Sequence, residues 1–431
     1  MRLRRGAALA LFALTPLLLL ALAVGGVLFL RQGGLAPYRV PHGGAALPPA
    51  TPATLERGEY VARIGNCITC HTTRGGVPFA GGRAFDTGFG TVYSTNLTPD
   101  VQSGLGEWSP EEFRHTMRNG VSRHGVLYPV FPFAHFALLD DADLDALFIY
   151  LRSLPAERRE ATPNRLSFPA SWRPAMIAWR MLFYRPPAHA GDAGRSPQQQ
   201  RGRYLVDGLG HCTMCHGTRG AMGSLPATGH LAGGTIPGMG WYAPPLDGQA
   251  LARWSTGELA RYLLSGTSPH GDAYGPMAEV VYSSLSHLHE DDAEAIADYL
   301  VSLQPHAARA HAAPEAVSAD GSVDGVAIYR EHCADCHGRE GHGKALEYPP
   351  LVDSVAVDAP DPVNAVRMIL YGAVAPTTPG NPRPYSMPPF VQRLDSAEIA
   401  AVANYIRASW GRGRADLSAA DVDAMHGIVL D

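Results

Sequence analysis

The chain has 431 residues, of which 46% are apolar and 17% are charged, and its formal net charge is −5 at pH 7. A mean hydropathy of −0.07 excludes a polytopic membrane protein and a mostly disordered chain, and the negative net charge argues against a nucleic-acid-binding protein. At about 100–200 residues per domain, the length predicts two to four domains. The 47 glycines and 36 prolines predict many loops and short helices rather than one large regular sheet.

The N-terminus combines a basic start with a long apolar run. Three arginines among the first five residues precede an apolar stretch over residues 6–30. As a helix, this stretch would span about 37 Å, enough to cross a bilayer, with its basic end on the cytoplasmic side. The alternative is a cleaved signal peptide, because residues 21–23 resemble a cleavage site. We favour an uncleaved transmembrane anchor over residues 1–31, and both interpretations place residues 32–431 outside the cytoplasm.

The six cysteines form three Cys-x-x-Cys pairs, and a histidine follows each pair directly. The three motifs consist of Cys67, Cys70 and His71; Cys212, Cys215 and His216; and Cys333, Cys336 and His337. This motif is typical of c-type haem attachment, in which the thiols add to the two vinyl groups and the histidine is the proximal iron ligand. A thioredoxin-like pair would need a βαβ context, and a structural zinc site would need two pairs close together. The sequence therefore predicts three covalently bound haem c groups.

Similar segments surround the three motifs, so the chain contains a repeat at the scale of a domain. A short predicted helix leads into each cysteine pair, and an amphipathic helix with an acidic start closes each repeat, over residues 141–154, 291–303 and 395–410. We predict an all-α protein with three tandem haem domains behind the N-terminal membrane helix. The predicted divisions are domain one over 52–155, a connector over 156–197, domain two over 198–305 and domain three over 320–412.

The predicted connector is rich in proline and in aromatic residues. It contains Trp172, Trp179 and Phe183, whereas flexible linkers are not so aromatic. We expect the connector to pack between domains one and two. A docking surface for a partner or for the membrane is the alternative.

Each haem iron needs a sixth ligand or keeps an open position. Met277 and Met387 stand in proline-containing loops after the second and third motifs, where a thioether ligand would raise the reduction potential. In the first repeat, Phe131 stands where a methionine would be expected, and His135 follows four residues later. We therefore predict ligation of the first iron by His71 and His135, with a lower potential than at the other two haems. The alternative is that His135 is a surface histidine and another residue is the ligand.

Over most of residues 52–412, the sequence resembles the triple-haem cytochrome c subunits of bacterial membrane-bound dehydrogenases. The motifs that carry this resemblance are Tyr93–Asp100, Gly240–Pro244, Gly275–Val281 and Asn404–Arg407. The resemblance implies class I cytochrome c domains, with the three motif histidines, Met277 and Met387 as iron ligands. It also implies that the chain passes electrons from a catalytic partner to membrane ubiquinone or to a terminal oxidase.

The partners in this family are quinoprotein alcohol dehydrogenases, flavoprotein sugar or gluconate dehydrogenases, and molybdenum-containing aldehyde or N-heterocycle hydroxylases. The run from Pro129 to Phe136 and the segment 165–183 are more similar to the subunits that serve the molybdenum enzymes. We therefore favour a partner with molybdopterin and iron–sulfur subunits that oxidises an aldehyde or an N-heterocycle. The alternative is the same role beside a quinoprotein or a flavoprotein.

The chain itself contains no motif that resembles a molybdopterin, flavin or quinone-cofactor site, and no glycine-rich dinucleotide motif follows a predicted strand. We therefore expect no catalytic residue, and a role as a non-catalytic electron-transfer subunit on the periplasmic face of the bacterial inner membrane. A haem peroxidase acting at an open first haem and a free-standing cytochrome are less favoured alternatives.

Overall fold

A computed structural model describes residues 15–16, 19–20, 22–27, 47–184, 194–220, 222–224, 231–303, 323–344, 347–411 and 415–426. Most of the predicted N-terminal span lies outside these ranges. Within them, no helix combines the length and the apolar character that a membrane crossing requires. We call the segments 52–155, 198–303 and 323–411 the first, second and third repeats, since each contains one Cys-x-x-Cys-His motif.

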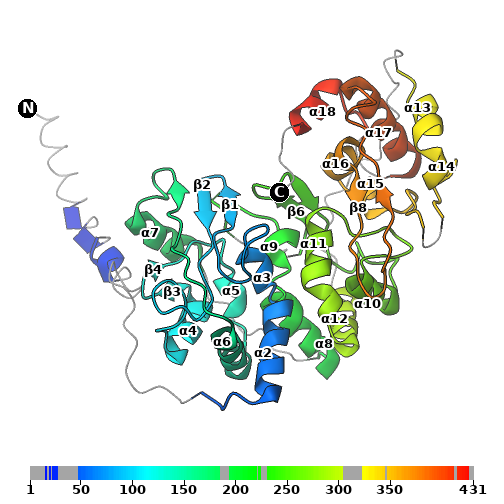
Figure 1. Cartoon of the computed structure of the whole chain (residues 1–431). Coiled ribbons are helices and arrows are strands. Elements are labelled where there is room, and N and C mark those ends of the chain that lie inside the picture. Colours follow the sequence, from blue (N-terminus) through cyan, green and yellow to red (C-terminus); the bar gives the residue numbers. More distant parts are fainter. Residues whose placement is uncertain are drawn as a thin grey trace, which may run out of the picture.

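Each repeat begins with a helix that leads into its cysteines and finishes on a closing helix (Figure 1). The helices of the first repeat are α2 (Pro52–Ile64), α3 (Cys67–Cys70), α4 (Pro110–Asn119), α5 (Phe133–Phe136) and α6 (Asp141–Ser153). Those of the second are α8 (Pro197–Arg203), the π-helix η1 (Tyr204–Leu209), α9 (Thr213–His216), α10 (Thr256–Ser265), α11 (Pro276–Ser283), the 3₁₀ helix η2 (Leu285–His287) and α12 (Glu290–Ser302). Those of the third are α13 (Gly325–His332), α14 (Ala334–His337), α15 (Val355–Asp358), α16 (Val363–Tyr371) and α17 (Ser396–Trp410), and α18 (Ala419–Met425) follows. The closing helices α6, α12 and α17 confirm the three predicted acidic-start helices to within one residue at each end.

The described chain is largely helical, but its loops also form small antiparallel ladders that an all-α prediction does not include. The strands are β1 (Ala84–Thr87), β2 (Gly90–Tyr93), β3 (Val121–Ser122), β4 (Gly125–Val126), β5 (Arg165–Leu166), β6 (Gly234–Ile236), β7 (Trp241–Ala243), β8 (Ala373–Val374) and β9 (Ser386–Met387). They pair as β1-β2-β5, β3-β4, β6-β7 and β8-β9. These short pairings satisfy backbone groups in the long loops between the helices.

The connector joins the first repeat more closely than the sequence suggests. Its strand β5 pairs with β2, and its helix α7 (Arg173–Phe183) buries Met176 and Ile177. The indole of Trp179 donates a hydrogen bond of 2.8 Å to the carbonyl of Met222 in the second repeat. The connector therefore contacts both repeats, while other apolar side chains, including Phe168 and Trp172, stay exposed.

The leading and closing helices of every repeat cross at a glycine. A Cβ atom on that glycine would collide with a backbone carbonyl of the closing helix and would crowd the Cβ of a tyrosine one turn further along that helix. Only glycine therefore allows this close approach. The three crossings place Gly58 against Ala146 and Tyr150, Gly202 against Ala295 and Tyr299, and Gly325 against Ala401 and Tyr405. A glycine in the leading helix thus allows the same helix crossing in all three repeats.

The repeats differ in how they share their cores. Buried apolar residues of the first and second repeats form one continuous cluster, with Leu144 and Val206 at its fully buried centre. The third repeat has a separate cluster around Val366, Ile399 and Val402. The first two repeats therefore bury apolar surface together, which strengthens their association.

Candidate functional site

Each of the three motif histidines is held by the same contact. The Nδ1 atom lies 2.7 Å from the carbonyl oxygen of Thr95 for His71, 2.7 Å from that of Pro244 for His216, and 2.9 Å from that of Pro349 for His337. Because a carbonyl can only accept, Nδ1 must donate, and the lone pair is left on Nε2. A metal-binding imidazole is typically oriented by such a hydrogen bond.

Burial lowers the pKa of each of these three imidazoles, and the carbonyl contact only partly offsets it. The neutral ring is the form that can bind iron. Burial likewise raises the pKa of the thiols, to about 12 for Cys67 and Cys212 and to about 11 for Cys70 and Cys333. Protonated thiols of this kind are unlike the low-pKa thiolates of redox-active cysteine pairs.

A single cavity of about 1720 Å³ runs between the second and third repeats. Its lining includes both motifs and the two predicted methionine ligands, namely Cys212, Cys215, His216 and Met277 from the second repeat and Cys333, Cys336, His337 and Met387 from the third. Apolar side chains such as Leu263, Ile369 and Phe390 complete the wall. An apolar wall with a histidine and a methionine in each half fits a flat, apolar macrocycle that is bound through its iron.

The structure places Phe131 at the first-repeat position that Met277 occupies in the second. The amide of Leu127 donates to the carbonyl of Gly120 at 2.8 Å, and the amide of Ala273 donates to that of Gly266 at 2.7 Å. Phe131 and Met277 each follow four residues after these matched amides. The ring of Phe131 packs against Phe136, with 5.5 Å between the ring centroids.

His135 is buried, so the alternative interpretation of a surface histidine is wrong. Its Nδ1 lies 2.7 Å from the carbonyl oxygen of Asp207, and its Nε2 lies 3.1 Å from the hydroxyl of Thr213. Thr213 stands inside the second Cys-x-x-Cys-His motif. Burial is the main cause that lowers the pKa of His135 to about 4, so the ring is neutral. Since Asp207 and Thr213 both belong to the second repeat, both ring nitrogens of His135 contact that repeat.

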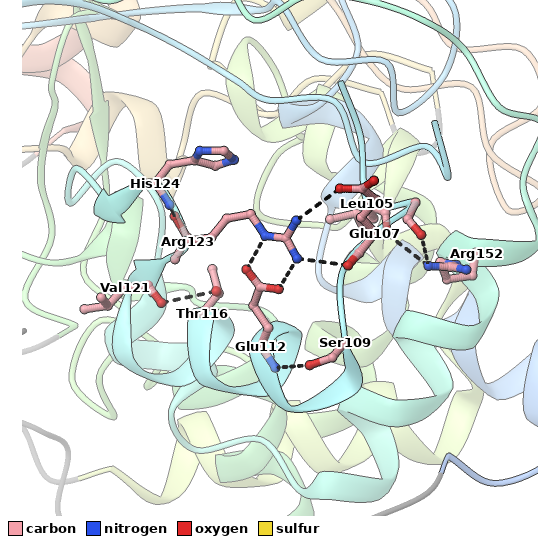
Figure 2. Close-up of polar contacts among 11 residues, drawn as sticks. Leu105, Glu107, Ser109, Glu112, Thr116, Val121, Arg123, His124 and Arg152 are labelled. Carbon is pink, nitrogen blue, oxygen red and sulfur yellow. Dashed lines mark hydrogen bonds and ion pairs between the residues drawn. The ribbon is translucent and has the colours of Figure 1, made fainter. Parts of the chain in front are cut away.

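An ion pair with a buried carboxylate fixes the segment that leads to Phe131. Arg123 bonds the carboxylate of Glu112 on α4 at 2.6 and 2.5 Å and the carbonyl of Glu107 at 2.9 Å, and Figure 2 shows its guanidinium between these two groups. The hydroxyl of Thr116 donates to the carbonyl of Val121 at 3.2 Å. These contacts tie the β3–β4 hairpin to α4.

The first and second repeats exchange hydrogen bonds in a reciprocal way that sequence reasoning missed. Asp143 on α6 and Asp292 on α12 each bind an arginine of their own repeat and a tyrosine of the other. The bonds are Arg57 to Asp143 at 2.7 and 3.0 Å, Tyr204 to Asp143 at 2.5 Å, Arg201 to Asp292 at 2.7 and 2.7 Å, and Tyr60 to Asp292 at 2.5 Å. The sequence that could have indicated these bonds is the Arg-Gly-x-Tyr run that the two repeats share. This run does not reveal which aspartate the arginine and the tyrosine bind.

The third repeat is attached differently, because it has neither this arginine nor this tyrosine. Asn364 on α16 accepts from the amide of Tyr242 at 2.9 Å and donates to its carbonyl at 2.7 Å. Thr378 donates to the carbonyl of Ser265 at 2.9 Å. These contacts hold the two walls of the shared cavity together.

Comparisons with known proteins find cytochrome c models and cytochrome c subunits that are similar to this chain. The family model described as cytochrome c matches residues 199–304 and 322–410, and the model described as cytochrome C oxidase, cbb3-type, subunit III matches residues 53–151. The chain is 37% identical over 399 residues to the gluconate 2-dehydrogenase cytochrome c subunit of Pantoea cypripedii, covering 88% of this chain and 90% of that protein. It is 34% identical over 415 residues to the alcohol dehydrogenase (quinone), cytochrome c subunit of Gluconobacter oxydans, covering 90% and 85%.

A further relative is a nicotinate dehydrogenase subunit of Pseudomonas putida, which is 41% identical over 405 residues. The alignment covers 89% of this chain but only 33% of that protein. The chain thus spans about a third of the length of this relative.

Proposed function

Because the chain belongs to the family of cytochrome c subunits of bacterial dehydrogenases, we propose that it is the triple-haem electron-transfer subunit of a membrane-bound dehydrogenase complex. The observation that carries this proposal is the threefold repetition of one arrangement, a Cys-x-x-Cys-His motif whose histidine donates from Nδ1 to a backbone carbonyl. A chain with three such motifs and no other cysteine has the residues to hold three haems.

Each group of residues has a separate role in this proposal. Haem c, when bound, supplies one-electron redox chemistry at a potential that its axial ligands tune. The six cysteines would hold it covalently, and His71, His216 and His337 would present Nε2 to the iron. Met277 and Met387 would offer their thioethers as further iron ligands, and the apolar wall would exclude water.

We extend the proposal to the organisation of the chain. The haem domains would cover residues 52–155, 198–305 and 320–412, with 156–197 as the connector between the first two. The basic start and apolar run of residues 1–31 support an anchor that holds the protein on the periplasmic face of the inner membrane, with ubiquinone or a terminal oxidase as the acceptor.

For the catalytic partner, we propose a molybdenum-dependent aldehyde or N-heterocycle dehydrogenase. The run from Pro129 to Phe136 supports it, as does the similarity to a protein named for nicotinate, which is an N-heterocycle. The relatives named for gluconate and alcohol dehydrogenases support a flavoprotein or quinoprotein partner to the same degree. The role of this chain is the same in either case.

The test is to solubilise membranes mildly, capture the tagged full chain and identify the proteins that come with it. A molybdopterin subunit and an iron–sulfur subunit would support the favoured partner, and a quinoprotein or flavoprotein would support the alternative. The haem content of the captured chain, measured as the pyridine haemochrome, should be three per chain. It should fall to two when Cys333 and Cys336 are both replaced by alanine. Capture of no dehydrogenase, or fewer than three haems in the wild type, would contradict the proposal.

A further inference from the structure

We propose that the first repeat holds its haem with an open sixth position, which binds a small diatomic ligand such as carbon monoxide. This inference replaces the assignment of His135 as the sixth ligand. It rests on the proposed attachment of haem at Cys67, Cys70 and His71. The juxtaposition that carries it is Phe131 at the methionine position, with His135 turned toward the second repeat.

The match between the first and second repeats locates the sixth position. The helices α4 and α10 both begin at a serine N-cap. Both end at a glycine in the left-handed region, Gly120 with φ 61° and Gly266 with φ 79°. The carbonyl of each glycine accepts a hydrogen bond from an amide further along the chain, that of Leu127 for Gly120 and that of Ala273 for Gly266. Four residues after Leu127 and Ala273 stand Phe131 and Met277. A phenyl ring has no lone pair to offer iron, whereas a thioether has one.

The starts of the closing helices identify the counterpart of His135. The amides of Asp140 and His289, which precede α6 and α12, each donate to a tyrosine hydroxyl of the other repeat, Tyr204 at 3.5 Å and Tyr60 at 3.4 Å. His135 and Ser284 stand five residues before these matched amides. The hydroxyl of Ser284 donates to the carbonyl of Ile64 in the first repeat at 3.2 Å. His135 therefore occupies a position that contacts the neighbouring repeat in both halves of the pair.

The contacts of His135 agree with this placement. Its Nδ1 bond to a carbonyl is like those of the proximal histidines, but the carbonyl belongs to Asp207 of the second repeat. Its Nε2, the nitrogen that would bind iron, lies 3.1 Å from the hydroxyl of Thr213. The rings of His135 and His211 are also close, with 6.5 Å between centroids. His135 is thus a positioning residue that holds residues 127–135, here called the distal segment of the first repeat, against the second motif.

The distal segment is fixed at its start as well. The hydrogen bonds from Arg123 to Glu112 and Glu107 anchor the β3–β4 hairpin (Figure 2). The amide of Leu127, just after the hairpin, donates a hydrogen bond to the carbonyl of Gly120. Phe131 is therefore held in place from both sides, by the hairpin before it and by His135 after it. A segment fixed in this way cannot easily rearrange to bring His135 over the first motif.

The test uses the purified full chain with its haems attached. Reduced protein is titrated with carbon monoxide, and the ferric protein is examined by electron paramagnetic resonance. We expect one high-spin haem and one carbon monoxide bound per chain. Phe131→Met should convert this haem to low spin and lower carbon monoxide binding at least tenfold. Phe131→Leu is the matched control, because leucine offers no ligand, and binding should persist.

His135→Val separates the two roles of the histidine. Valine offers iron no ligand, so we expect the spin state and the carbon monoxide stoichiometry to stay unchanged if His135 is not bound to the iron. An entirely low-spin wild type that binds no carbon monoxide would overturn the inference. A new high-spin haem in His135→Val would then identify His135 as the ligand. One in Met117→Leu would identify Met117, which is the one methionine in the sequence of the first repeat and is buried on α4. The proposed function is tested separately by haem content and by the captured dehydrogenase, neither of which depends on carbon monoxide.

Discussion

The hydroxyl of Tyr60 in the first repeat donates a hydrogen bond of 2.5 Å to the carboxylate of Asp292 in the second. That carboxylate also accepts two bonds of 2.7 Å from Arg201 of its own repeat. Tyr204 and Asp143 repeat the relationship in the opposite direction, also at 2.5 Å. The reciprocal exchange, together with the continuous apolar core, makes the first two repeats an approximately twofold pair that associates as one unit.

Replacing Tyr60 by phenylalanine should weaken this pair. The change leaves the buried carboxylate of Asp292 with one donor fewer, and a lost hydrogen bond to a charged group costs about 1.5–3 kcal/mol of unfolding free energy. Denaturant unfolding of the haem-containing chain, followed at its first transition, measures the loss. Tyr282→Phe is the control, because Tyr282 is 61% exposed and should change stability by less than about 0.5 kcal/mol. Equal effects of the two substitutions would contradict the structural role of Tyr60.

The same contact should give stability a defined pH window. Burial alone would raise the pKa of Asp292, but the bonds from Arg201 and Tyr60 bring it below the ordinary value of 3.8. Its contribution is therefore present above the pKa of the unfolded chain and is lost as the pH falls through the lower folded value. Burial, followed by the bond to Asp292, raises the pKa of Tyr60 above its ordinary 10.0. That contribution is complete below the unfolded pKa and is lost as the pH rises toward the folded one.

We therefore expect the difference in unfolding free energy between the wild type and Tyr60→Phe to be constant between about pH 5 and 9 and to shrink toward about pH 3 and 11. Thermal melts across this range measure it, with Tyr282→Phe as a reference that should show no such profile. A difference that is the same at pH 3, 7 and 11 would show that Asp292 and Tyr60 do not titrate as a pair.

The sequence predicted those elements of the fold that depend on neighbouring residues in the chain. The closing helix of each repeat follows from an acidic start and a helical apolar period, and the helix-crossing glycines lie in segments that already looked alike. The bond between Tyr60 and Asp292 joins residues 232 positions apart, and no local pattern indicates which repeat supplies the partner. The contacts of His135 with Asp207 and Thr213 were missed for the same reason, because both partners belong to the second repeat.

The glycine crossings predict a large effect for a small substitution. Gly325→Ala would place a methyl group against the carbonyl of Ala401 and the Cβ of Tyr405, and overpacking of this kind costs about 1–3 kcal/mol. Gly257→Ala in α10 is the matched control, because nothing lies within 4 Å of its added Cβ. Alanine there should be neutral or stabilising by up to about 1 kcal/mol. Unfolding followed at the third haem measures the loss, and similar behaviour of the two variants would contradict the proposed close crossing.

Met387 provides the sharpest test of the iron ligands in the shared cavity. It lies on β9, paired with Ala373 of β8, and it lines the cavity together with His337. If its thioether binds iron, Met387→Leu should turn one low-spin haem into a high-spin one. Met387→His should keep the low-spin state and lower the reduction potential, because a methionine ligand raises the potential.

Met368 is the matched control for this test, because it lines the same cavity from α16 but is not a predicted ligand. Met368→Leu should leave both the spin state and the potential of the third haem unchanged. Electron paramagnetic resonance and a redox titration of the full chain report the two quantities. A high-spin haem in Met368→Leu, with none in Met387→Leu, would move the ligand from β9 to α16. Since β8 and β9 hold Met387 by backbone pairing, we expect the opposite result.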